Sequence, residues 1–241
     1  MSVYAGRGLH GRIVDEIGVR IVGGAYPAGE TLFSERLEKE FAVSKTVVRE
    51  ALKVLAAKGL IESRQKRGTI VQPRSEWTHL DADVLRWQEA SHPDFGLLEN
   101  LSEVRAIIEP ASVRLAALRR SDDDLALLEQ CLADMVAAGD KADVMAAADV
   151  RFHQALLEAT HNELLTGLEN VLAAGLRIRD RFVHHGLPGA DPIPEHRALL
   201  EAIRDGDGDL ASQTMTNLLE QASVDLAEAR LAREGKPDAT E

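Results

Sequence analysis

Residues 44–59 have the sequence SKTVVREALKVLAAKG, which signals the start, the buried face and the end of one α-helix. Ser44 precedes the helix and can accept hydrogen bonds from its first backbone N–H groups, as N-cap residues do. Gly59 follows the last turn, at a position that favours a left-handed backbone. The apolar residues that share one face are Val48, Ala51, Leu52 and Leu55. We expect this face to pack on a preceding helix and the opposite, basic face to remain in solvent.

Two helices are predicted upstream. Residues 34–41 predict a short helix capped by Ser34, and only a few residues separate it from the helix after Ser44, which is helix-turn-helix spacing. Residues 9–22 predict an earlier helix that a Gly-Gly pair ends. The apolar face of that earlier helix recurs every fourth residue, at Ile13, Ile17 and Ile21.

Two strand-like runs follow Gly59. Residues 60–63 (LIES) and 69–71 (TIV) predict short strands, and between them lies the basic turn Gln65-Lys66-Arg67-Gly68. A β-hairpin directly after a helix-turn-helix is a wing. Residues 44–67 contain seven basic residues and two acidic ones, so helix and wing both present positive charge.

Charge is divided unequally along the chain. The 241 residues carry a formal net charge of −12, which by itself argues against a nucleic-acid partner. Residues 1–75, however, contain 13 Lys and Arg against 8 Asp and Glu, whereas the remainder contains 15 against 32. A basic segment can meet phosphate groups while an acidic body resists non-specific adhesion to DNA.

The basic helix is therefore a candidate for DNA recognition. In helix-turn-helix proteins the N-terminal end of such a helix enters the major groove. Arg49 and Lys45 can donate hydrogen bonds to guanine, and Thr46 can contact a base or a phosphate. Lys66 and Arg67 on the wing can contact the DNA backbone or the minor groove. The alternative is a solvated basic face on an ordinary helical subdomain.

Beyond residue 96 the sequence is rich in Ala and Leu and lacks strand-like alternation. We expect helices near residues 97–119, 121–138, 142–160, 162–184, 193–205 and 207–232. The predicted fold is mostly α, with a winged helix-turn-helix in residues 1–74, a linker with a short helix in 75–96, and an all-α helical bundle in 97–234. Trp77 and Trp87 are expected to anchor the linker rather than to bind a ligand.

Composition also bears on location. No apolar run approaches the roughly 18 residues of a membrane span, and the first residues do not predict a signal peptide. The one cysteine, Cys131, forms no intrachain disulfide and fits a reducing compartment. We expect a cytoplasmic protein with no membrane partner.

Polar residues in the C-terminal half indicate a second site. Asp149 and His153 stand four residues apart, so one helix face presents a carboxylate and an imidazole that can share a metal ion. His196 begins another helix and supplies a second imidazole. Arg105 on an earlier helix suits a carboxylate ligand through bidentate hydrogen bonds. Spacing alone leaves open that these are surface pairs or satisfied core histidines.

Residues 43–52 (VSKTVVREAL), with 58–62 (KGLIE) and 67–71 (RGTIV), resemble the winged-helix signature of the GntR family of transcription regulators. The resemblance covers residues 9–74 and implies contact with operator DNA. Residues 32–37 (LFSERL) are one residue shorter than the corresponding family motif. The candidate DNA-binding residues are Arg36, Ser44, Lys45, Thr46, Arg49, Lys66, Arg67 and Gly68.

Residues 97–230 resemble the FCD domain, the effector domain of the FadR subfamily, through 102–105 (SEVR), 109–110 (EP), 149–153 (DVRFH), 160–162 (THN) and 195–199 (EHRAL). Many members bind a divalent metal, often zinc or nickel, through one Asp and three His. The resemblance implies Asp149, His153 and His196 as three of these ligands. The last histidine normally lies three residues after a methionine, but Met215 places Leu218 there and no histidine follows His196. Either water or the effector completes the shell, or the pocket binds its effector without metal.

Residues 22–24, 77–87, 102–105 and 202–209 resemble more closely one member of this family, a regulator of sugar-acid catabolism. This resemblance implies a small organic acid as effector, a sugar acid such as a hexonate. The candidate effector-binding residues are Arg105, Asp149, His153 and His196. Dimeric helix-turn-helix proteins present two recognition helices to a pseudo-palindromic operator, so we expect a homodimeric repressor whose DNA affinity the effector changes.

Two other classes of protein stay open. A metal-dependent enzyme could use Asp149, His153 and His196 around an open coordination position. No neighbouring group stands out as a general base, however, and an enzyme would not need the basic winged segment. A non-catalytic metabolite- or metal-binding scaffold could use the basic segment to contact an acidic protein.

Overall fold

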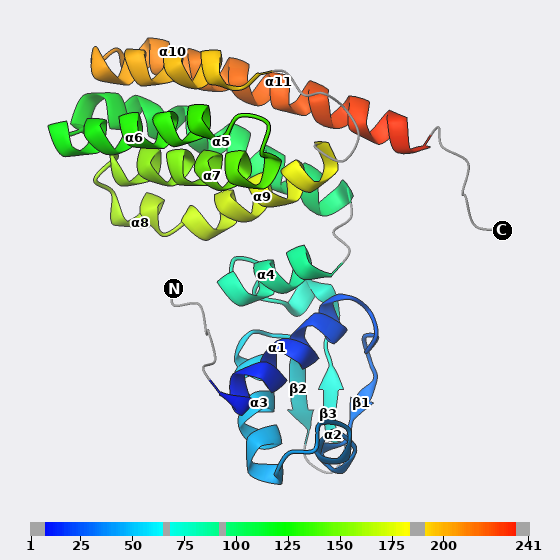
Figure 1. The fold of residues 1–241 in the computed structure, drawn as a ribbon. Coiled ribbons are helices and arrows are strands. Elements are labelled where there is room, and N and C mark those ends of the chain that lie inside the picture. Colours follow the sequence, from blue (N-terminus) through cyan, green and yellow to red (C-terminus); the bar gives the residue numbers. More distant parts are fainter. Residues whose placement is uncertain (1–7, 65–67, 92–94, 184–190, 235–241) are drawn as a thin grey trace. The chain divides into compact units, whose positions relative to one another are not determined.

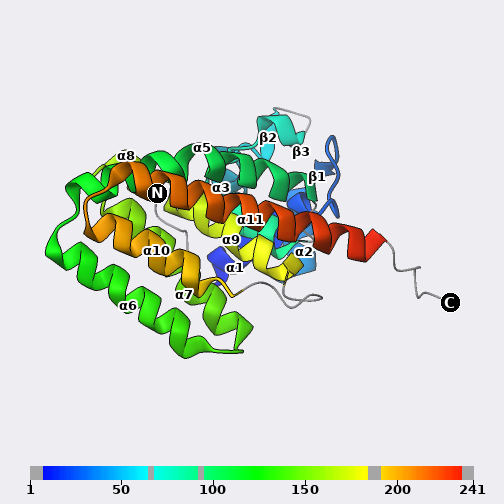
Figure 2. The ribbon, with the colours of Figure 1, turned by 90° about the horizontal axis from the view of Figure 1, so that it is seen from above.

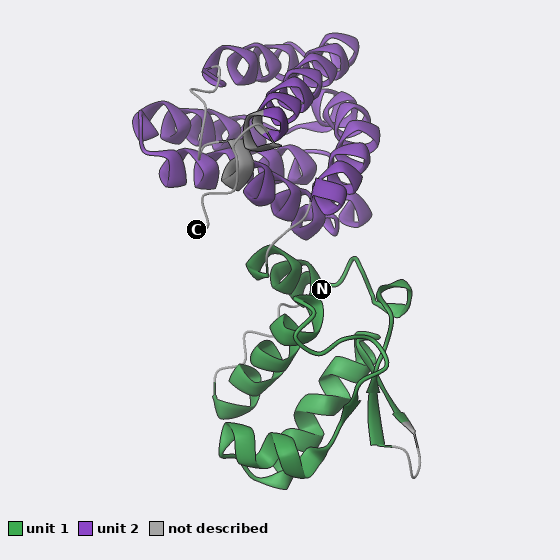
Figure 3. Cartoon of the chain, turned by 90° about the vertical axis from the view of Figure 1, so that its right-hand side faces the viewer, with its two compact units in different colours: residues 1–93 green, residues 94–241 purple. Residues whose placement is uncertain are grey.

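The computed structural model describes residues 8–64, 68–91, 95–183 and 191–234. The chain forms two compact units, residues 1–93 and 94–241 (Figure 3), and each is described by itself. The predicted wing contacts Lys66 and Arg67 lie outside the described residues.

The first unit is a small α/β structure (Figure 1). Its three strands form an antiparallel sheet in the order β1-β3-β2, in which Ile70 of β3 lies opposite both Thr31 and Glu62. Helices α2 and α1 both pack on α3. The elements are α1 (Leu9–Val22), β1 (Thr31–Leu32), α2 (Ser34–Phe41), α3 (Lys45–Ala57), β2 (Ile61–Arg64), β3 (Gly68–Val71), the 3-10 turn Arg74–Glu76 and α4 (Ala82–Ala90).

Helix α3 has the ends and the buried face that its sequence predicts. The Ser44 hydroxyl accepts a hydrogen bond from the backbone N–H of Val47 at 3.5 Å. At the other end, Gly59 has φ +76° and its N–H bonds to the carbonyl of Ala56, while Leu60 N–H bonds to that of Leu55. This pair of bonds is a Schellman motif. The buried residues of the helix are Val48, Ala51, Leu52 and Leu55.

Two local features differ from the sequence prediction. Ser34 is not the cap of α2: it is the first residue of the helix, and Phe33 holds the N-cap position without a side-chain hydrogen bond. Strand β1 was not predicted, because two residues are too short to show a periodicity of two. It forms only through its pairing with β3.

Helix α4, the short helix expected in the linker, is packed against α1 of the first unit. Its Val84 and Trp87 are fully buried and belong to the same hydrophobic core as Leu55 of α3. Lys58, which ends α3, lies 2.7 Å from a carboxylate oxygen of Asp81 and 2.8 Å from one of Asp83. Helix α3 and its C-terminal end are thus joined to α4 by both apolar and ionic contacts.

Replacing Gly59 with alanine is expected to lower the free energy of unfolding of this unit by about 2 kcal/mol or more. Its positive φ is unfavourable for a residue with a Cβ, and that Cβ would lie 2.1 Å from the backbone carbonyl oxygen of Glu76. Gly29→Ala is the matched control, since Gly29 has φ +87° but no atom within 4 Å of the added Cβ. Urea unfolding would measure the free energy of unfolding of both variants. Equal decreases would show that the close approach to the Glu76 carbonyl contributes nothing.

The second unit is all-helical in its described residues. Helix α11 packs against α5, α9 and α10 (Figure 2), and α6 packs against α7. The main core joins Val113 of α5, Leu128 of α6, Phe152 of α7, Leu199 of α10 and Met215 of α11. The helices are α5 (Phe95–Arg119), α6 (Asp122–Ala138), α7 (Ala142–Glu158), α8 (Glu163–Thr166), α9 (Glu169–Val183), α10 (Ile193–Arg204) and α11 (Gly208–Glu234).

One predicted helix of this unit is divided. The segment expected as a single helix near residues 162–184 forms α8 and α9, separated at Gly167 and Leu168. Glycine disfavours a helix interior by about 1 kcal/mol relative to alanine, and the short α8 has its own N-cap in Asn162. Among the described residues, no helix is long and apolar enough to span a membrane.

Candidate functional site

The start of α3 presents polar and basic side chains to solvent. Ser44, Lys45, Thr46 and Arg49 are all exposed. Neither Lys45 nor Arg49 forms a hydrogen bond or an ion pair with another described residue, whereas Lys53 further along contacts Glu50 at 2.7 Å. The side chains on the N-terminal turn of α3 are thus available to donate hydrogen bonds to another molecule.

The other predicted DNA contacts have different surroundings. Arg36 on α2 is exposed and lies 3.4 Å from Glu30 and 3.9 Å from Glu40, so it already has anionic neighbours. Gly68 at the start of β3 is exposed and has φ +86°.

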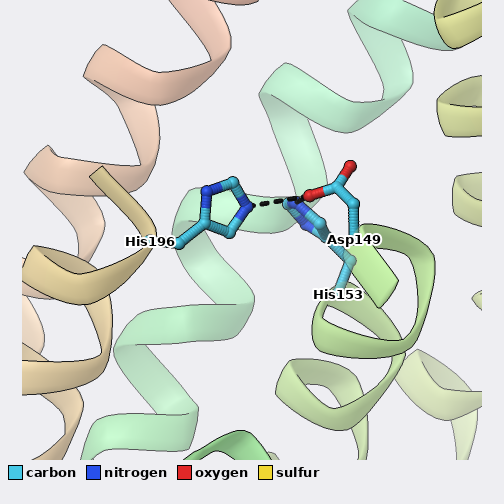
Figure 4. A group of neighbouring side chains, drawn as sticks. All are labelled: Asp149, His153 and His196. Carbon is cyan, nitrogen blue, oxygen red and sulfur yellow. Dashed lines mark ion pairs between the residues drawn. The ribbon is translucent and has the colours of Figure 1, made fainter. Parts of the chain in front are cut away.

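In the second unit, Asp149, His153 and His196 converge in the interior (Figure 4). Asp149 and His153 come from α7 and His196 from α10. The Nε2 atom of His196 lies 2.9 Å from Oδ1 of Asp149, and Nε2 of His153 lies 3.6 Å from the same oxygen. All three residues are buried, and one ligand atom from each lies within 4.8 Å of the others. The three residues that the resemblance to the FCD domain implies as ligands thus lie together.

The donor atoms of this cluster fit a divalent cation. Asp149 Oδ1, His153 Nε2 and His196 Nε2 are buried and face one another, and in the described part of the chain none of them has a hydrogen-bond partner outside the cluster, whereas buried polar atoms are normally satisfied. The outer nitrogen of each ring has a neighbour: His196 Nδ1 lies 2.7 Å from the carbonyl oxygen of Pro192, and His153 Nδ1 lies 2.7 Å from Oε2 of Glu109. Metal-ligating histidines are commonly held in this way.

Neighbouring charges keep the carboxylates of Asp149 and Glu109 ionised. Burial acts to raise the pKa of Asp149, but His196 and His153 hold it well below its usual value. Burial likewise opposes ionisation of Glu109, yet Arg105 and His153 lower its pKa to about 2. Burial acts to lower the pKa of His196, whereas Asp149 and the Pro192 carbonyl raise it. The net effect is a raised pKa for His196 and an ionised Asp149, whose carboxylate can face a bound cation.

Helix α11 brings no fourth protein ligand at the position where the family has one. Met215 is fully buried in the apolar core, and Leu218 packs against that core. A metal held by three protein ligands would have coordination positions left for water or another oxygen.

A cavity of about 160 Å³ lies between α5, α9 and α11. Its walls include the guanidinium-bearing side chains of Arg105 and Arg179 and the hydroxyl-bearing side chains of Ser102, Thr216 and Ser223. Arg105 is the one predicted effector-binding residue on the wall; Asp149, His153 and His196 are not among the residues that line it. Sequence reasoning missed Arg179 altogether.

Sequence reasoning also missed Glu109. This carboxylate is 3% exposed and accepts a hydrogen bond from Nε of Arg105 at 2.5 Å. The signal was present, because Arg105 and Glu109 stand four residues apart and so share one helix face.

The two units are a small α/β unit with a helix-turn-helix and an all-helical unit, and each matches a known family. Residues 9–71 match the model of the bacterial regulatory proteins of the gntR family, and residues 100–221 match the FCD domain. The chain belongs to the GntR family and carries an FCD domain, as the sequence motifs predicted. It is a DNA-binding transcription regulator and not an enzyme.

Particular relatives support this placement. The chain is 38% identical over 220 residues to the galactonate operon transcriptional repressor of Escherichia coli K12, covering 90% of this chain and 96% of that protein. It is 34% identical over 211 residues to the HTH-type transcriptional regulator LutR of Bacillus subtilis, covering 81% and 90%. The solved structure of Lar from Listeria monocytogenes has a TM-score of 0.62 at 17% identity, covering 92% and 98%, which supports the fold. The predicted likeness to a sugar-acid regulator is thus confirmed by the first of these relatives.

Proposed function

We propose that this protein is a homodimeric repressor whose DNA affinity is changed by a sugar acid, such as a hexonate, bound in the FCD domain. The observation that carries the proposal is the buried Asp149–His153–His196 cluster in the same helical unit as a cavity walled by Arg105 and Arg179. Arginine recognises carboxylates through paired hydrogen bonds, and the cavity hydroxyls suit a polyhydroxylated chain. A relative of this chain is named as the repressor of a galactonate operon.

On the DNA side, we assign base recognition to Lys45, Thr46 and Arg49. Their exposure at the N-terminal turn of α3 is what a helix in the major groove requires. Ser44, Gly68, Lys66 and Arg67 are assigned to the phosphate backbone or the minor groove. Arg36 is assigned a weaker role, because Glu30 and Glu40 already neighbour its guanidinium.

In the effector domain, Asp149, His153 and His196 would hold a divalent ion, zinc or nickel. One carboxylate and two imidazoles are donors that suit these metals. When bound, the ion would offer an open coordination position to an oxygen of the effector. The protein contributes the buried setting and the orientation of the two rings.

An electrophoretic shift assay on the region upstream of the protein's own gene tests the proposal. The purified protein should retard this duplex in preference to random DNA at moderate salt. D-galactonate should change the affinity by about 5–150-fold, the usual range for coupling between two sites. Equal affinity for random DNA would refute the regulator assignment, whereas operator binding that no hexonate changes would refute the effector class alone.

Replacing His196 with alanine is expected to weaken zinc or nickel binding by about 100-fold or more, because it removes one of three protein ligands. His161→Ala is the matched control, since His161 is half exposed and pairs with Asp124 away from the cluster. Isothermal titration of the full-length protein with each metal measures both variants. The same affinity for His196→Ala and the parent would exclude His196 as a ligand.

A further inference from the structure

The buried carboxylate of Glu109 contacts two functional groups at once. Its Oε1 accepts the hydrogen bond from Nε of Arg105 at 2.5 Å, and its Oε2 lies 2.7 Å from Nδ1 of His153. Arg105 lines the cavity, and His153 belongs to the metal-type cluster. Glu109 therefore links Arg105 at the cavity wall to His153 of the cluster.

We propose that Glu109 is a positioning residue: it holds His153 with the proton on Nδ1, so that Nε2 faces Asp149 and His196, and Arg105 at the cavity wall holds Glu109 in place. The inference rests on the proposed metal site. A carboxylate oxygen and an unprotonated ring nitrogen 2.7 Å apart would repel each other, so this spacing favours a proton on Nδ1. The two atoms lie at ion-pair distance, although the ring nitrogen is not aligned for a hydrogen bond.

His196 shows the same arrangement with a different partner. Its Nδ1 lies 2.7 Å from the backbone carbonyl of Pro192, which leaves Nε2 directed at Asp149. The two rings thus turn equivalent nitrogens toward one carboxylate oxygen. The two partners differ in charge. The Pro192 carbonyl is neutral, whereas the Glu109 carboxylate is charged and forms an ion pair with Arg105. Glu109 thus connects the His153 side of the cluster to the wall of the cavity.

The first experiment measures zinc affinity by competition with a chromophoric chelator in the full-length protein. Glu109→Gln keeps the size of the side chain but removes the charge that holds both neighbours, and it is expected to weaken zinc binding by about 10–100-fold. Asp225→Asn is the matched control: Asp225 pairs with Arg179, the other arginine of the cavity, at 3.2 Å and does not belong to the cluster. Its zinc affinity is expected to equal that of the parent.

The second experiment uses the unmodified protein and so does not depend on the folding of a variant. Nitrogen-15 NMR of labelled histidine, with His153 identified by its loss in His153→Gln, reports which ring nitrogen is protonated. The metal-free protein should show His153 as the Nδ1–H tautomer, although free imidazole side chains favour Nε2–H.

The outcomes separate this inference from the metal site itself. Unchanged zinc affinity in Glu109→Gln, or an equal loss in Asp225→Asn, overturns the positioning role while the metal site stands. A parent protein that binds no zinc and no nickel overturns the metal site, and the tautomer of His153 then decides whether Glu109 orients the ring. An Nε2–H tautomer overturns the inference in either case.

Discussion

An Arg49→Ala protein is expected to lose specific operator binding while it remains folded. Arg49 is exposed on the first turns of α3 and forms no ion pair among the described residues, so its removal leaves no buried group unsatisfied. A bidentate arginine–guanine contact contributes about 1–3 kcal/mol. In a dimer both recognition helices lose this contact, so the free energy of operator binding should become less favourable by about 2–6 kcal/mol in total.

The measurement is an operator titration in parallel with a titration of random duplex. Loss of a base contact lowers affinity for the operator and flattens the preference over random DNA, whereas loss of a phosphate contact lowers both together. Arg204→Ala is the control, because Arg204 carries the same charge on an exposed part of α10, where it pairs with Glu129. If Arg49→Ala retained the operator preference of the parent, α3 would not be the recognition helix.

The DNA-binding half was predictable because its signals are local. A cap, a periodic apolar face and a terminal glycine determine α3 within residues 44–59, and the structure places them as expected. Phe33 shows the limit of such reasoning. Serine is a strong N-cap residue, yet Ser34 lies inside α2, because Phe33 rather than Ser34 has the extended backbone of the cap.

The cluster in the effector domain was predictable only in part. Asp149 and His153 are neighbours on one helix face, so their spacing reveals them, but the position of His196 depends on how α10 packs against α5, α6 and α11. The contact of Glu109 with His153 and that of Arg179 with Asp225 were missed for the same reason. They join residues 44 and 46 positions apart, respectively, and no local pattern in the sequence encodes such pairings.

Helix α4 is a structural part of the DNA-binding unit. A helix that the sequence places in a linker shares the hydrophobic core of the DNA-binding unit and bonds to the end of α3 through Lys58. Burial acts to raise the pKa of Asp83, but Lys58 and Arg86 lower it, so Asp83 stays ionised at neutral pH. The folded head at neutral pH therefore includes α4, and forces applied to α4 act on the unit that contains the recognition helix.

Replacing Trp87 with alanine is expected to destabilise this head by about 3–5 kcal/mol, the usual loss for a large aromatic side chain removed from a core. Trp87 is fully buried, and its indole N–H donates to Asp15 at 3.0 Å. Its ring lies so close to α1 that a Cβ at Gly18 would be 2.6 Å from ring atoms. Small domains have only about 5–15 kcal/mol of stability in total, so this single change should leave the head marginally stable.

Urea unfolding followed by the fluorescence of Trp77 would measure this loss selectively, since both tryptophans of the chain lie in the first unit. Leu80→Ala is the matched control from the same segment: Leu80 is 59% exposed, and its removal should change the free energy of unfolding by less than about 0.5 kcal/mol. The Trp87→Ala protein should also lose operator affinity at temperatures where its DNA-binding unit unfolds. If Trp87→Ala and Leu80→Ala were equally stable, the packing of α4 would contribute nothing to the stability of this unit.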